Sequence, residues 1–137
     1  MFRILAAALL ILVATGAQAG QKRVCSQAEA MQAEEESDRL SDWPAVYRSF
    51  KRFAHCDDGA IWEGYSDSIA RMLASRWEQL EDLRRLVVAD KGFERFVLRH
   101  IDGLMTTEQQ QLILENARAR CPSNAKRLCG LIEKRAR

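Results

Sequence analysis

Several features that would assign this chain to a familiar class of protein are scarce or missing. Among the 137 residues there are only two histidines, and none of the four cysteines belongs to a C-x-x-C pair. A thioredoxin-like redox site is therefore not indicated, and no ligands stand at the spacing of a zinc finger. The formal net charge is only +2, with basic and acidic residues interspersed, so a basic face for binding nucleic acid is not indicated either.

The chain also lacks the patterns that divide a protein into domains or build a sheet. No stretch rich in proline, glycine or serine interrupts it, and no segment alternates apolar and polar residues with the period of a strand. Both prolines, Pro44 and Pro122, stand where a helix is expected to begin. The sequence therefore predicts a single all-α domain over residues 20–137.

Long apolar runs are missing too, apart from one at the N-terminus. The positive start Met1–Arg3 precedes the apolar run Ile4–Val13, and the small-residue segment Ala17–Ala19 follows. This order predicts a secretory signal peptide over residues 1–19 and a protein located in the periplasm or secreted. No later run approaches the roughly 20 apolar residues of a transmembrane helix. Cys25 lies behind the polar segment Gln21–Arg23 rather than at the cleavage site, so we expect no lipid anchor.

Helix-start signals and apolar spacing divide the domain into five to seven short helices. Ser26 opens a capping-box sequence, Asp42 can cap a helix with Pro44 in its first turn, and Thr106 offers a further cap. The spacing predicts helices over about 26–38, 42–54, 58–76, 80–87, 93–102, 106–113 and 122–132. We expect the third of these to be the central helix, and Gly103 to end the fifth.

Four cysteines in an exported chain of this size predict two structural disulfides. Three pairings are open, and helical-hairpin geometry favours one of them. In an antiparallel hairpin, facing residues have position numbers with a constant sum, and the midpoint of Cys25 and Cys56 falls in the turn expected at residues 40–42. The midpoint of Cys121 and Cys129 falls close to the break at residues 122–124. We therefore predict the bridges Cys25–Cys56 and Cys121–Cys129.

The densest polar cluster, residues 55–68, joins the second and third predicted helices. Trp62 lies off the apolar stripe there and is a candidate exposed aromatic, a residue type that often anchors protein interfaces. Gly59 and Gly64 suggest a close helix approach or a backbone left open to a partner. From this cluster we predict a surface that contacts a partner, made of Asp57, Asp58, Trp62, Glu63, Tyr65 and Asp67.

Simpler and catalytic interpretations of the same cluster stay open. Asp57 or Asp58 can act only as a helix cap, with Glu63 as an ordinary solvated carboxylate. His55 with Asp58 or Glu63 would be needed for acid–base chemistry. The alternating acidic order of a calcium loop is absent, and we expect no metal and no cofactor. His100 fits a surface position near a helix C-terminus, where a protonated imidazole is stabilised by the helix dipole.

Several short blocks resemble small exported all-helical proteins of proteobacteria that carry no assigned activity. The blocks are Cys25, residues 55–59, residues 63–67, residues 96–102, Cys121-Pro122 and Cys129. More distantly, residues 64–67 followed by a helix pair and late cysteines look like the periplasmic immunity proteins that neutralise peptidoglycan amidase effectors of type VI secretion. That resemblance implies an all-helical protein that inserts a surface loop or helix into the active site of a toxin.

These observations together predict a non-enzymatic exported protein that acts by binding another protein, with an immunity or inhibitor module as one form. One alternative is a carrier of a small ligand, a lipid or a metal between the helices. The other is a small enzyme that depends on His55. We expect an envelope or secreted protein as the partner, and no nucleic acid.

Overall fold

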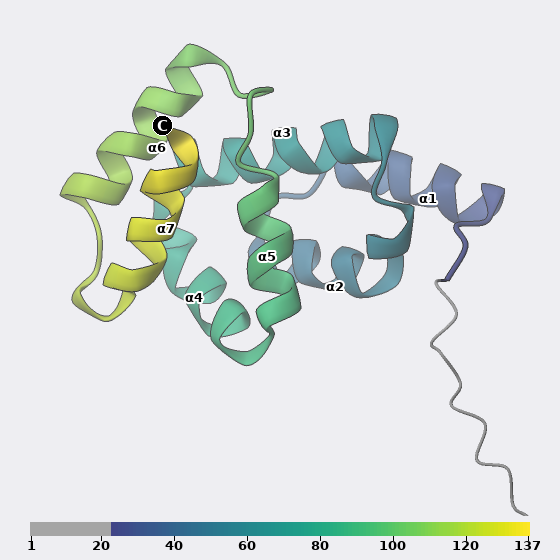
Figure 1. Cartoon of the computed structure of the whole chain (residues 1–137), viewed down its shortest axis with the longest axis horizontal. Coiled ribbons are helices and arrows are strands. Elements are labelled where there is room, and N and C mark those ends of the chain that lie inside the picture. The colour runs from purple at the N-terminus through teal and green to yellow at the C-terminus, as the bar shows by residue number, and fades with distance from the viewer. Residues whose placement is uncertain (1–22) are drawn as a thin grey trace, which may run out of the picture.

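Residues 23–137 are described by a computed structural model, and this part of the chain folds into seven α-helices joined by short turns (Figure 1). The helices are α1 Gln27–Ser37, α2 Trp43–Phe53, α3 Gly59–Ser75, α4 Leu80–Ala89, α5 Lys91–Arg99, α6 Thr107–Ala119 and α7 Lys126–Ala136. Three 3-10 turns, Ala54–Cys56, Trp77–Gln79 and Ser123–Ala125, precede α3, α4 and α7. The all-α prediction of five to seven short helices is confirmed. The predicted signal peptide, residues 1–19, lies outside the described residues.

Most helices begin where local side chains can satisfy the first backbone N–H groups. Ser26 and Thr106 each form a complete capping box, and Asp42, Asp58 and Asp90 accept hydrogen bonds from the backbone of the first turn that follows them. These caps depend on residues no more than three positions apart. They explain why the helix starts were predictable from sequence.

The fifth helix is shorter than predicted. It ends at Arg99 rather than near residue 102, and its predicted break before residue 93 is reduced to Asp90 alone. The N–H of His100 bonds to carbonyls in a tightened last turn, and Asp102 turns back toward α3. A long-range polar contact therefore ends this helix, before Gly103 is reached.

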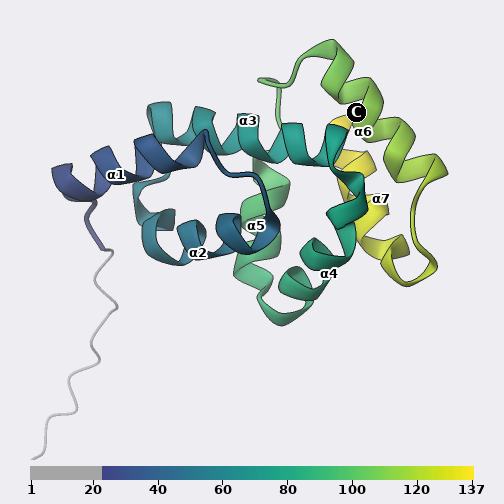
Figure 2. The ribbon, with the colours of Figure 1, turned by 180° about the vertical axis from the view of Figure 1, so that it is seen from behind.

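The long helix α3 is central, as predicted. It packs against α1 near its N-terminal end and against α6 farther along, and α7 packs on α6 (Figure 1). Seen from behind in Figure 2, α2, α4 and α5 lie together on one side of α3. Tyr65 and Phe96 meet edge-to-face with ring centroids 5.0 Å apart, and this contact joins α3 to α5. Full burial of each large apolar side chain contributes about 1.5–3 kcal/mol.

Both predicted disulfides are confirmed. Cys25–Cys56 ties the segment before α1 to the turn before α3, with Cα atoms 5.0 Å apart. Cys121–Cys129 ties the end of α6 to the second turn of α7, with Cα atoms 6.2 Å apart. In the chain-entropy account each bridge contributes about 2–4 kcal/mol, and more where the closed loop is longer. None of the described helices is both long enough and apolar enough to cross a bilayer.

Candidate functional site

The structure separates the six residues of the predicted partner surface into two groups. Asp58, Glu63 and Asp67 are exposed, and Trp62 is half-buried. The side chains of Asp57 and Tyr65 are buried, with exposed fractions of 1% and 0%. The first group can contact a partner, whereas the assignment of Asp57 and Tyr65 to that surface is wrong.

Tyr65 is buried because it belongs to the apolar face of α3. Its ring packs on Phe96, and its hydroxyl lies 2.8 Å from the Ser49 hydroxyl inside the core. Burial raises the pKa of the Tyr65 phenol to about 12, so the group stays neutral at physiological pH. Tyr65 follows Ile61 and precedes Ile69 by four residues each, the spacing of one helix face, and that pattern is the better guide to its position.

Asp57 and Asp58 have different roles. Asp58 caps α3, since its Oδ1 accepts a hydrogen bond of 2.8 Å from the N–H of Gly59. Gly59 has a φ of +54°, a left-handed conformation that favours glycine. Asp57 instead turns inward, where it pairs with Arg99 and lies 3.1 Å from His100 Nε2. One of its oxygens, Oδ1, is buried without a hydrogen-bond partner.

His100 is the centre of a buried polar network, so its predicted surface position is wrong. Its exposed fraction is 0%, and its Nδ1 lies 3.0 Å from Ser66 Oγ. Ser66 Oγ donates to Asp102 Oδ2 over 3.0 Å, and Trp62 Nε1 donates to the same oxygen over 2.9 Å. Since the Ser66 proton goes to Asp102, Ser66 accepts from His100 Nδ1–H.

The hydrogen-bonded series Ser66–His100–Asp57 matches the Ser-His-Asp order of a hydrolase triad, but the surroundings of its serine are different. A triad serine is open to the substrate carbonyl that it attacks. Ser66 is 1% exposed, and its proton is already committed to Asp102. In this structure the network joins α5 and the turn after it to α3 and the turn before it. The residues of the network are 34–43 positions apart, so no local sequence signal marks them.

Two exposed residues of the predicted surface, Glu63 and Asp67, line a shallow groove between α1 and α3, which we call the acidic groove. Its hollow of about 400 Å³ is lined by Glu34, Ser37, Asp38, Ala60, Glu63, Gly64 and Asp67. Four of these seven residues are carboxylates. Asp67 pairs with Arg71 and Asp38 lies 3.9 Å from Arg39, whereas Glu34 and Glu63 form no ion pair with any described residue. The groove therefore carries uncompensated negative charge.

Gly64 allows α1 and α3 to meet at the floor of the acidic groove. A Cβ atom at this position would lie 2.2 Å from Ser37 Oγ and 3.1 Å from the backbone nitrogen of Asp38. Nearby, Ser68 Oγ donates to the Ser37 carbonyl oxygen over 2.7 Å. The predicted close helix approach at Gly64 is therefore present, and α1 is the element it contacts.

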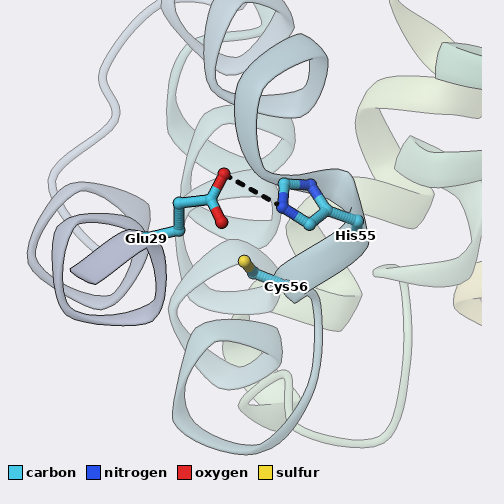
Figure 3. A group of neighbouring side chains, drawn as sticks. All are labelled: Glu29, His55 and Cys56. Atoms are coloured by element: carbon cyan, nitrogen blue, oxygen red, sulfur yellow. Dashed lines mark ion pairs between the residues drawn. The ribbon is translucent and has the colours of Figure 1, made fainter. Parts of the chain in front are cut away.

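A second cluster joins the start of α1 to the turn before α3 (Figure 3). His55, predicted to work with Asp58 or Glu63, instead has Glu29 as its charged neighbour, with Nε2 3.3 Å from Glu29 Oε1. Hydrogen bonds from the backbone and side chain of Ser26 lower the pKa of Glu29 to about 2. Cys56 lies beside the pair as half of a disulfide. The sequence marked Glu29 only as part of a helix cap.

Neither a family model, nor a curated protein, nor a solved structure matches this chain. The resemblance to exported helical proteins and to immunity proteins thus rests on short blocks of sequence, and it stays a prediction. The features of the described residues that bear on function are the acidic groove, the buried network around His100 and the cluster around His55.

Proposed function

We propose that this chain is an exported, non-enzymatic protein that binds a partner protein with a basic surface through the acidic groove. The observation that carries the proposal is the convergence of four carboxylates from two helices on one hollow, two of them without an ion-pair partner among the described residues. Charges of one sign on an exposed surface attract and orient a partner of the opposite sign. An immunity or inhibitor module is the form of this function that the sequence resemblance suggests.

The shape of the acidic groove favours a macromolecular partner over a small ligand. Sites for small molecules are deep and mostly apolar, and they bury most of the ligand. The acidic groove is shallow, and its lining includes the small residues Ser37, Ala60 and Gly64. A protruding basic segment of another protein, such as a loop or helix bearing arginine, fits such a surface.

Trp62 is a second candidate contact residue, outside the lining of the acidic groove. It is half-buried, with its ring 4.2 Å from the His100 ring and the Arg99 guanidinium 5.4 Å from its centre. A tryptophan held in place by its neighbours, yet still partly exposed, loses little conformational freedom on binding and is a typical interface anchor. Glu63, the next residue in the chain, reaches the acidic groove.

The test is capture of a partner by tagged, oxidised protein lacking residues 1–19, from envelope and secreted fractions of its own host, followed by measured affinities. The variant Glu34→Gln with Glu63→Gln removes two charges without changing side-chain size. The matched control, Glu108→Gln with Glu115→Gln, removes two exposed carboxylates from α6. Exposed charge pairs contribute about 0.2–1 kcal/mol each, so we expect the loss of two charges to cost up to about 2 kcal/mol, or up to roughly a thirtyfold loss of affinity, for the groove variant alone.

The outcomes separate the proposal from its alternatives. A partner that binds through a basic surface, with an association rate that falls as salt rises, would support it. Equal affinity for the parent and the groove variant would refute the acidic groove as the binding surface. A small ligand recovered with the purified protein, and no protein partner, would instead support the carrier alternative.

A further inference from the structure

The cluster of Glu29, His55 and Cys56 at the start of α1 (Figure 3) has the composition of a metal site. Its sulfur, however, is in a disulfide. One ligand atom each from Glu29, His55 and Cys56 lies within 4.8 Å of the other two. The fourth member is Cys25, whose Sγ is bonded to that of Cys56. A carboxylate, an imidazole and two thiolates are all zinc ligands.

The imidazole of His55 is the observation that points to an ion. Its Nε2 is buried and forms no hydrogen bond with any described residue, although Glu29 Oε1 is only 3.3 Å away. In a tetrahedral zinc site with Zn–N and Zn–O bonds of about 2.0–2.2 Å, the nitrogen and oxygen ligands stand about 3.3–3.5 Å apart. The two atoms thus already have the separation that a shared zinc ion imposes.

Hydrogen bonds from Ser26 orient the Glu29 carboxylate toward His55. Its Oε2 accepts hydrogen bonds from Ser26 N at 3.1 Å and Ser26 Oγ at 2.8 Å, which leaves Oε1 directed at His55. Second contacts of this kind hold metal ligands in place. The competing ion pair comes from Arg23, whose side chain is 63% exposed and free to move away.

We propose that reduction of the Cys25–Cys56 disulfide creates a site for one Zn²⁺ ion, held by both thiolates, His55 and Glu29. A dithiol reductant supplies two electrons and two protons, so that the S–S bond becomes two thiols and the reductant becomes a disulfide. Zinc then displaces the thiol protons as it binds. In the oxidised chain the sulfurs carry no charge and the site is closed to zinc. This inference does not depend on the acidic groove.

The experiment uses the chain lacking residues 1–19 and carrying Cys121→Ser and Cys129→Ser, so that only one dithiol can form. A phosphine reductant opens the Cys25–Cys56 bridge without adding thiols of its own. Zinc is titrated in competition with a chromogenic chelator, and Co²⁺ is used as a spectroscopic probe of thiolate ligands. We expect one equivalent per chain after reduction and none before it.

Two single variants test the ligand set. His55→Ala and Glu29→Gln are each expected to weaken zinc binding at least tenfold, whereas the control Glu35→Gln, on the exposed face of α1, leaves it unchanged. No zinc binding by the reduced chain would overturn the proposal. Equal affinity in all three variants would overturn it too, because two thiols alone would then explain the binding.

The experiment still tests the zinc site if reduction unfolds part of the chain, because helix content is followed by circular dichroism in the same samples. If reduction unfolds part of the chain, we expect zinc to restore its helix content where His55 and Glu29 are present. Equal restoration in His55→Ala would contradict the proposed ligand set. No restoration in any chain would contradict the site itself.

Discussion

Replacing Gly64 with alanine tests whether the contact between α1 and α3 is as close as the structure shows. The new Cβ atom would lie 2.2 Å from Ser37 Oγ, 3.0 Å from Ser37 Cβ and 3.1 Å from Asp38 N. The hydroxyl can rotate away, but the other two atoms move only if α1 itself moves. Overpacking of this kind costs about 1–3 kcal/mol. Alanine regains about 1 kcal/mol of helix propensity, so we expect a net loss of up to about 2 kcal/mol.

Gly130 provides a matched control for this substitution. It lies inside α7, and a Cβ atom built there has no neighbour within 4 Å. Gly130→Ala should therefore show only the gain in helix propensity, about 1 kcal/mol of added stability. The two variants make the same chemical change inside helices. Opposite signs of the change in unfolding free energy are expected from the difference in packing alone.

Urea unfolding with both disulfides intact measures this difference. With a slope of about 1–3 kcal/mol per molar urea, a loss of about 2 kcal/mol lowers the midpoint by roughly 0.7–2 M. Ser37→Ala removes the closest clashing atom, and in the Gly64→Ala background it should recover part of the loss. A Gly64→Ala protein as stable as Gly130→Ala would show that the two helices are not in close contact.

Three further predictions concern the buried polar groups. Asn116→Ala removes the amide that donates to the carbonyls of Leu73 and Ala74, both at 3.0 Å, and should cost about 1–3 kcal/mol in urea unfolding. Tyr65 should titrate at about pH 12 in an alkaline absorbance titration, and Tyr65→Phe should abolish that late step. The stability that its neutral phenol contributes is complete below the usual pKa of 10.0 and is lost as the pH rises through 12. His100→Ala leaves a buried carboxylate without its imidazole and should lower the midpoint by more than Asn116→Ala does.

The parts of the fold that depend on neighbouring residues were predictable from sequence. Ser26 and Thr106 cap the helices that follow them because the bonds reach only to residue i+3. The disulfides were predictable for a related reason, since a hairpin of two helices relates positions by simple geometry. Cys25 and Cys56 are 31 residues apart, but the segment that separates them is a single hairpin of the helices α1 and α2.

The candidate sites needed the tertiary structure. Asp57 and Asp58 are adjacent and chemically alike, and nothing local distinguishes the one that caps α3 from the one that turns inward to His100. That choice depends on α5, which brings His100 to within 3.1 Å of a residue 43 positions earlier. The acidic groove was foreseen only in part, because Glu63 and Asp67 were assigned to a surface while their neighbours from α1 were not.

Helix α1 contributes residues to both the acidic groove and the proposed zinc site. It carries Glu29 at its first turn and Glu34 of the acidic groove farther along, yet only two of its side chains, Ala33 and Ser37, are buried. So small a buried surface holds a helix weakly, and its position depends on the Cys25–Cys56 bridge and on the contact of Ser37 with Gly64. Reduction of the bridge should therefore loosen one wall of the acidic groove, and zinc should tighten it again. Partner affinity measured in the oxidised, the reduced and the zinc-loaded chain should then follow the order high, low, high. An affinity that does not change with the redox state would mean that the contacts of α1 with α3 hold it in place without the bridge.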